Sequence, residues 1–312
     1  MGTIAEKLVY LNDTKNILKT NLINKDVVLT GSETFRELAN KVNDIQGGSG
    51  KVSPEFISFY SCIGTSIDLS WLDTSNITRM NLIFANCNNL TSLDLSNFDT
   101  SKVTTMEGMF NYCRSLTALD LSNFDTSKVE NMKTMFSNCS SLRSLDLSNF
   151  DTSNVNSMTQ MFQQCSSLLS LDISSFTTSK LTSMSYMFYN CTSLGSLNLS
   201  NFDIRNITNT SSVFYRCMEL KIIQGILDMQ NVTNAGDMFT SCSALEEVHI
   251  HNLGVNLNLS SCTKLTHDCL VELINNLQTV TSTKTLTLGS TNLAKLTDAE
   301  KQVATNKGWT LA

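Results

Sequence analysis

Cysteine recurs along most of this chain at nearly constant intervals, and this period constrains the fold more than any other feature. Eight of the 10 cysteines follow one another at intervals of 25 or 26 residues. These are Cys62, Cys87, Cys113, Cys139, Cys165, Cys191, Cys217 and Cys242. A regular period of this length is the signature of a repeat architecture, in which one unit cannot bury its apolar edge alone. We therefore expect a stack of similar units.

The first half of each unit predicts a strand followed by a turn. In residues 139–164, apolar and polar side chains alternate over Leu145-Asp146-Leu147, which is typical of a short strand with Asp146 facing away from the core. Asp151-Thr152-Ser153 follows, and such residues accept hydrogen bonds from exposed N–H groups at a turn or a helix N-cap.

The second half of the unit predicts a short helix, because its apolar residues fall three or four positions apart and would share one helical face. In this unit they are Val155, Met158, Phe162 and Cys165. The expected fold class is α/β: a leucine-rich-repeat solenoid of about eight strand-turn-short-helix coils over residues 52–248.

Stacked coils should bury ladders of like residues along a continuous core. The leucine ladder comprises Leu93, Leu119, Leu145, Leu171 and Leu197. The phenylalanine ladder comprises Phe110, Phe136, Phe162, Phe188, Phe214 and Phe239, and the methionine ladder Met80, Met106, Met132, Met158 and Met184. We interpret the cysteines as small buried residues at a corner. Disulfides between coils are the alternative, since neighbouring rungs roughly 5 Å apart would permit them.

The repeat resembles the BspA-like leucine-rich repeat surface proteins over about residues 55–248. The resemblance rests on the L-D-L-S-N-F-D-T-S and M-F-x-x-C signatures. It implies the solenoid fold, and it implies little about function, because the family includes adhesins and many proteins of unknown role.

The first 46 residues lack the repeat. Their apolar spacing predicts two amphipathic helices, and Gly47-Gly48-Ser49-Gly50 predicts a flexible linker over residues 47–51. The segments TIAEKLVYLNDTKNILKTNLINK and TFRELANKVNDI resemble the N-terminal module of tail and baseplate proteins of phages that infect Gram-positive bacteria. The resemblance implies that residues 1–46 attach the chain to other tail or baseplate proteins, with homo-oligomerisation as a further role. A helical cap on the first coil is the alternative.

Residues 249–312 also depart from the repeat and predict a C-terminal cap. The pattern predicts helices over 266–278 and 299–307, a strand over 284–288 and a last strand from Trp309. A cover of this kind is needed because the last coil has an open apolar face. The segment also resembles the closing segment of prophage-encoded repeat proteins.

Composition argues against two kinds of partner. The net charge of -6, with scattered Lys and Arg, argues against nucleic acid. No stretch of 18 apolar residues is present, so we expect no membrane insertion. The first 16 residues contain acidic and polar side chains where a signal peptide has positive and then apolar ones, so we expect the chain to be either cytosolic or exported by a route that needs no such peptide.

The sequence has no motif that indicates catalysis. It contains neither a phosphate-binding loop nor a G-x-S-x-G element. His249, His251, Cys262, His267 and Cys269 lie close together in sequence, but their spacing fits no standard zinc motif. Nothing in the sequence orients His267 toward either cysteine. We expect no enzyme, no resident metal in this cluster and no cofactor.

The candidate ligand-binding residues form the exposed column of the predicted sheet. They are Asp68, Asp94, Asp120, Asp146, Asp172 and Asn198, continued by Gln224 and His249. Their spacing would be roughly 5 Å, and serines flank them. One interpretation is a solvated face copied by repeat duplication. The other is a strip that binds sugar hydroxyls, a basic partner or a cation such as calcium.

Three tyrosines, Tyr112, Tyr189 and Tyr215, lie just before or near the repeat cysteines. They are interpreted as partly buried edge residues, with stacking on sugars as the alternative. Trp71 replaces the usual Asn of its repeat and is expected to cover the N-terminal end of the stack.

These features together predict a binding protein. The leading hypothesis is a phage or prophage tail-associated, receptor-binding protein of the virion, which recognises a bacterial surface glycan or protein through the repeat face. The alternatives are a BspA-like adhesin at the bacterial cell surface and an intracellular protein-interaction scaffold.

Overall fold

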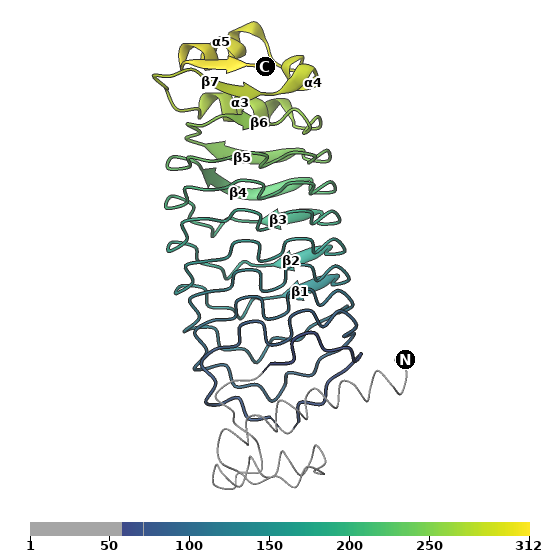
Figure 1. Cartoon of the computed structure of the whole chain (residues 1–312). Coiled ribbons are helices and arrows are strands. Elements are labelled where there is room, and N and C mark those ends of the chain that lie inside the picture. The colour runs from purple at the N-terminus through teal and green to yellow at the C-terminus, as the bar shows by residue number, and fades with distance from the viewer. Residues whose placement is uncertain (1–57, 71) are drawn as a thin grey trace, which may run out of the picture.

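The protein is a stack of similar coils that ends in a C-terminal segment of different structure (Figure 1). The structure is a computed structural model, and it describes residues 58–70 and 72–312. The predicted attachment module, the Gly-rich linker and Trp71 lie outside the described residues. No described helix is long and apolar enough to cross a membrane.

Short parallel strands stack along one side of the coils. Their bounds are β1 Ser144–Asp146, β2 Ser170–Asp172, β3 Ser196–Asn198, β4 Ile222–Asp228 and β5 Glu247–His251. β1 pairs with β2, and β3 pairs with β4 and β4 with β5, each in parallel. The register places Leu145 beside Leu171 and Leu197 beside Ile223, so equivalent positions of successive repeats are neighbours. The predicted strand and ladder arrangement is confirmed for these coils, whereas the equivalent residues of the described coils before Ser144 form no strand.

The predicted short helix of the repeat is wrong. In residues 155–165 the chain forms successive turns, and alternate N–H groups bond to the next coil instead of to the carbonyl four residues back. Gln160, Phe162 and Gln164 donate to carbonyls 25 residues ahead at 2.7–3.1 Å. The N–H groups between them close turns onto carbonyls three residues back at 3.1–3.2 Å.

Left-handed backbone conformations make these turns possible. Gln160 and Gln164 have φ angles of 61° and 59°, a region that a helix cannot contain. The equivalent residues of the other described coils repeat the conformation. A chain of turns and a helix both return an apolar residue to the core every three or four positions. The sequence period alone therefore could not distinguish a chain of turns from a helix, and the helix was the wrong prediction.

Aromatic and sulfur-containing side chains fill the core between the strands and the turns. All six phenylalanines of the predicted ladder are fully buried, and successive rings from Phe59 to Phe239 stack with centroids 5.4–5.8 Å apart. The methionine ladder is buried as well. The leucine ladder is less uniform: Leu145 and Leu197 are buried, whereas Leu93, Leu119 and Leu171 are partly exposed and pack against the core.

The polar residues of the repeat motif bind the coils to one another. Thr100 is 1% exposed; its hydroxyl donates to the carbonyl of Asp125 at 2.9 Å and accepts from the N–H of the same residue at 2.8 Å. Asn123 donates from Nδ2 to the carbonyls of Leu95 and Phe98, both at 3.0 Å. Similar bonds recur through the stack, so the Asn and Thr of the motif satisfy backbone groups that the turns leave unpaired.

The cysteines form a ladder of free, buried thiols. From Cys87 to Cys242 each Sγ donates to a Phe carbonyl of the preceding coil at 2.9–3.2 Å. Burial raises the pKa of Cys113, Cys165 and Cys242 to about 12. The interpretation as small buried residues is confirmed, and the thiolate needed for reactivity is strongly disfavoured.

The C-terminal segment covers the last coils with mixed structure. Its elements are β6 Leu257–Asn258, α3 His267–Asn275, β7 Lys284–Thr287, α4 Gly289–Leu293, α5 Asp298–Asn306 and β8 Trp309–Leu311. β6, β7 and β8 form a parallel sheet, as the strand predictions for 284–288 and from Trp309 anticipated. The helix expected over 266–278 is α3, and the one expected over 299–307 is α5.

Two side chains near the C-terminus attach α5 and β8 to the end of α3. Lys307 donates from Nζ to the carbonyl of Leu277 at 3.0 Å and to two other carbonyls at the same helix end. Trp309 is 2% exposed and donates from Nε1 to the carbonyl of Gln278 at 2.9 Å. A cation at a helix C-terminus and a buried indole with a satisfied N–H both stabilise the junction.

We expect Thr100→Val to destabilise the protein by about 2 kcal/mol or more, because it leaves the N–H and C=O of Asp125 unpaired. Thr100→Ser retains the hydroxyl and loses only a buried methyl, so it should cost about 1 kcal/mol. Urea unfolding of the two variants beside the unchanged protein measures both. Equal stability of Thr100→Val and the unchanged protein would contradict the hydrogen-bond ladder.

We also expect the thiols from Cys113 to Cys242 to resist a maleimide in the native protein and to react within minutes in denaturant. Mass spectrometry counts the labels under each condition. Rapid native labelling at these positions would show that the coils open far more readily than the buried ladder allows.

Candidate ligand-binding site

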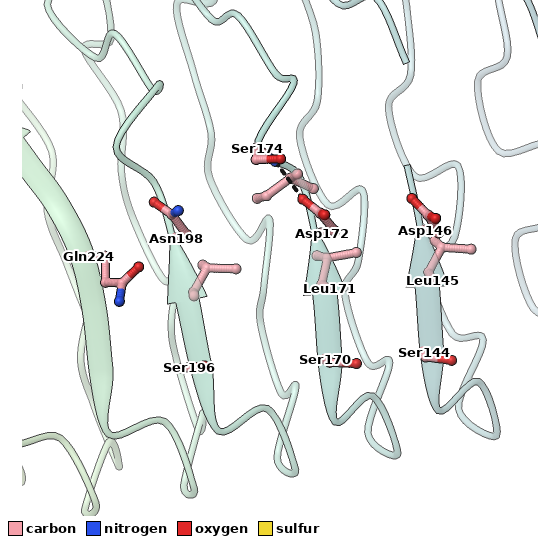
Figure 2. A pocket seen from close by; sticks show the side chains of 12 residues that line it. Ser144, Leu145, Asp146, Ser170, Leu171, Asp172, Ser174, Ser196, Asn198 and Gln224 are labelled. Atoms are coloured by element: carbon pink, nitrogen blue, oxygen red, sulfur yellow. Dashed lines mark hydrogen bonds between the residues drawn. The ribbon is translucent and has the colours of Figure 1, made fainter. Parts of the chain in front are cut away.

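The predicted acidic column lies on the exposed side of the stacked strands. Asp146 of β1 is beside Asp172 of β2, and Asn198 of β3 is beside Gln224 of β4. Figure 2 shows these four side chains projecting from one face of neighbouring strands. All six predicted site residues, including Asp68, Asp94 and Asp120, are exposed. The structure thus brings Asp146, Asp172, Asn198 and Gln224 together in the predicted order.

Each of these side chains also has a local structural role. One oxygen of every carboxylate in the column accepts a hydrogen bond from the backbone N–H two residues ahead, at 2.9–3.0 Å. Asn198 makes the same bond to Ser200 at 3.0 Å. The bond closes a turn at the end of the strand. A carboxylate accepts about four hydrogen bonds, so acceptor capacity remains for a ligand at Asp146 and Asp172.

Hydrogen bonding keeps these carboxylates ionised. Hydrogen bonds from the hydroxyl and the N–H of Ser174 lower the pKa of Asp172. The neighbouring charge of Asp146 raises this pKa, but by less. In Asp146 the bonds from Ser148 lower the pKa. The column is therefore negatively charged at neutral pH, in spite of its close spacing.

A shallow hollow of about 470 Å³ lies at the point where the column changes from acidic to neutral. Serines of successive strands form one side, and the acidic and amide side chains form the other (Figure 2). Its polar lining comprises Ser144, Asp146, Ser170, Asp172, Ser174, Ser196, Asn198 and Gln224. Leu171 is partly exposed in its floor. The hollow offers carboxylate acceptors at one end, amide donors at the other and hydroxyls throughout.

Two exposed apolar side chains near this face were not anticipated from the sequence. Leu169, directly before β2, is 56% exposed, and Ile226 of β4 is 53% exposed. Both occupy columns that hold small or polar residues in most other repeats. Ile226 lies at a register shift between β4 and β5, where Gly225 has a φ of 95°. A departure from the repeat pattern was the available sequence signal.

The histidines are held by acidic side chains at the junction with α3. His249 was expected on the open strand face, but its Nδ1 lies 2.8 Å from Glu272 and its Nε2 3.0 Å from Glu247. His251 bonds to the other oxygen of Glu272 at 2.8 Å. The helix therefore covers this end of the column, which the strand pattern could not reveal.

His267 also has partners that the sequence did not suggest. It lies 3.2 Å from Asp268 and 3.0 Å from Glu300. The thiols of Cys262 and Cys269 donate to backbone carbonyls instead. In residues 58–70 and 72–312, no group of three or more His, Cys, Asp or Glu side chains is arranged to hold a metal ion.

The His249–Glu272 contact predicts a pH-dependent stability. Partial burial lowers the pKa of His249, but the bonds to Glu272 and Glu247 outweigh it and raise the pKa above its usual value of 6.5. Burial raises the pKa of Glu272, and the bonds from His251 and His249 outweigh that and lower it. The contribution of His249 to the free energy of unfolding is therefore complete below about pH 6.5, and it is lost as the pH rises through the folded-state pKa of His249. The contribution of Glu272 to the free energy of unfolding is complete above about pH 4.5, and it is lost as the pH falls through the folded-state pKa of Glu272.

We accordingly expect His249→Gln to lower Tm at pH 5.5 and to change it little at pH 8.5. Thermal unfolding of the variant and of the unchanged protein across this range measures the difference. A loss of stability of the same size at both pH values would contradict an ionic contribution from His249.

Comparison with known proteins identifies the repeat region. The family model described as "Mycoplasma protein of unknown function, DUF285" matches residues 57–168 and 142–252. The two matches overlap and together span more than half of the chain. BspA-like repeat proteins contain this domain, which confirms that part of the resemblance found in the sequence. No curated protein matches the chain. The chain therefore belongs to the DUF285 family.

Proposed function

We propose that the chain is a binding protein that recognises a bacterial surface molecule through the hollow on its strand face. The observation that carries the proposal is the lining of that hollow, which combines serine hydroxyls, the carboxylates of Asp146 and Asp172, and the amides of Asn198 and Gln224. Hydroxyl-rich ligands require such closely spaced donors and acceptors. The stack would be a BspA-like leucine-rich-repeat solenoid that displays this face.

We further propose that the chain acts as part of a phage or prophage tail. Support comes from the resemblance of residues 1–46 to tail and baseplate modules, which would attach the chain while residues 52–248 face the host and 249–312 cap the stack. The chain would bind its ligand without catalysis and without a resident cofactor. Calcium bound to the acidic column is the alternative to test. A cell-surface adhesin and an intracellular scaffold are the competing assignments.

Four substitutions in the column test the binding site: Asp94→Asn, Asp120→Asn, Asp146→Asn and Asp172→Asn together. Asparagine can accept the same turn-closing N–H bond, as Asn198 does. Removing the aligned charges should raise Tm at low salt, and the gain should shrink in 1 M salt, where charge repulsion is screened. Binding of the labelled full chain to a panel of Gram-positive cells should fall at least tenfold.

A control for three of these four charges lies outside the hollow on the coils of Asp94, Asp120 and Asp146. Asp99, Asp125 and Asp151 close equivalent turns with N–H bonds of 2.9–3.0 Å, and they do not line the hollow. Their replacement by Asn removes charge of the same sign and should leave cell binding intact. Equal losses in both variants would attribute binding to net charge. If a chelator abolishes cell binding of the unchanged protein but does not affect that of the column variant, calcium is assigned to the column.

Location separates the three assignments. After prophage induction of the source strain, an antibody to the chain should label sedimented particles if it is a tail component. Label on intact cells without particles would favour the adhesin, and label in the soluble cell fraction alone would favour the scaffold.

A further inference from the structure

A second surface lies on the turn side of the stack, away from the hollow. One column there precedes the left-handed residue before each repeat cysteine. Its members are Ala85, Asn111, Ser137, Gln163, Tyr189, Tyr215 and Thr240. Their backbone groups make the bonds between coils, so the side chains are free to differ. Two adjacent tyrosines at such a position are therefore not a requirement of the fold.

Three tyrosines meet on this surface. The rings of Tyr189 and Tyr215 stack with centroids 4.8 Å apart and planes 4° apart. The ring of Tyr186 lies 5.6 Å from that of Tyr189 and is tilted by 49°. Tyr186 is 39% exposed, and the other two are half-buried. The rings thus form an angled aromatic surface instead of a set of isolated side chains.

Small neighbours leave parts of this surface uncovered. Thr240 follows Tyr215 in the stack, as the bond from the N–H of Arg216 to its carbonyl at 2.8 Å shows. Its short side chain, held by Asp237 at 3.1 Å, cannot cover a phenol ring. The N–H of Tyr186 bonds to the carbonyl of Ser211, which places the small Ser212 beside it. The aromatic stack therefore ends against small side chains.

Polar groups border the rings. The side-chain amides of Gln160 and Gln163 bond to each other at 2.6 Å on the preceding coil. Asn190 and Arg216 follow the two stacked tyrosines directly. Arg216 is exposed, and Asn190 is half-buried. Amide and guanidinium groups around an aromatic surface can bond to hydroxyls while the rings contact C–H groups.

We propose that Tyr186, Tyr189 and Tyr215 form a carbohydrate-binding platform, with a neutral bacterial polysaccharide as ligand. A pyranose presents C–H groups on its faces and hydroxyls at its rim, which matches rings bordered by Gln, Asn and Arg side chains. A stacked nucleobase is a poor alternative, because the chain carries a net charge of -6 and nucleic-acid surfaces need clustered cations.

Tyr112 supplies a contrast within the same protein. The guanidinium carbon of Arg114 lies 5.0 Å from its ring centroid, so the chain itself occupies one face of that ring. This tyrosine is half-buried and lies outside the three-ring cluster. It provides a substitution of the same type at a site that the platform does not include.

The test uses the full chain and an array of purified neutral polysaccharides from Gram-positive bacteria. The polysaccharide with the strongest signal is then titrated calorimetrically against the Tyr186→Ser/Tyr215→Ser variant and against Tyr112→Ser. We expect the double variant to lose at least tenfold in affinity and Tyr112→Ser to keep it. Circular dichroism and Tm check that both variants are folded. The Tyr186→Ser single variant, which alters only the exposed ring, serves if the double variant unfolds.

Three outcomes would overturn the platform: no polysaccharide bound, equal binding by the tyrosine variants, or self-association of the unchanged chain that the double variant abolishes. The last outcome would assign the rings to a contact between copies. The variant with asparagines in the acidic column should bind the polysaccharide normally. The hollow and the platform can therefore fail independently.

Discussion

The backbone hydrogen bonds between coils are the interaction on which the rest of this structure depends. In the turn region, alternate N–H groups point along the stack to the next coil, and those between them close turns three residues back. Each residue must therefore have nearly the same conformation as its equivalents in neighbouring coils. This requirement explains the constant repeat length, the left-handed residues at equivalent positions and the vertical ladders of Phe, Met and Cys.

The same constraint decides which residues of the motif carry functional information. Asn123 and Thr100 bond to backbone groups of neighbouring coils, Cys113 donates to a buried carbonyl, and Asp120 closes a turn. These residues would recur in any stack of this kind, whatever it binds. Positions at which the stack tolerates different side chains are more informative. Leu169, Gln224 and Tyr186 occupy such positions, and all lie at or near the two proposed surfaces.

The sequence predicted features that depend on spacing along the chain. Period and alternation were sufficient for the strands from β1 onward, the buried ladders, the exposed Asp positions, and α3, β7, α5 and β8 of the C-terminal segment. The sequence failed where the deciding partner was distant. A chain of turns was mistaken for a helix because both place Val155, Met158 and Phe162 on one side, and only bonds to the next coil distinguish them. The contact of His249 with Glu272 likewise depends on how α3 packs against β5.

The position of the hollow within the acidic column also has a physical cause. Asp172 has the carboxylate of Asp146 on one side and the neutral amide of Asn198 on the other, so the charged part of the column ends at this strand. Asn198 uses Oδ1 to close its turn, which directs its Nδ2 donor outward. A neutral ligand at this boundary finds fixed acceptors on one strand and a fixed donor on the next. Neither the fully acidic coils before it nor the helix-covered histidines after it offer that combination.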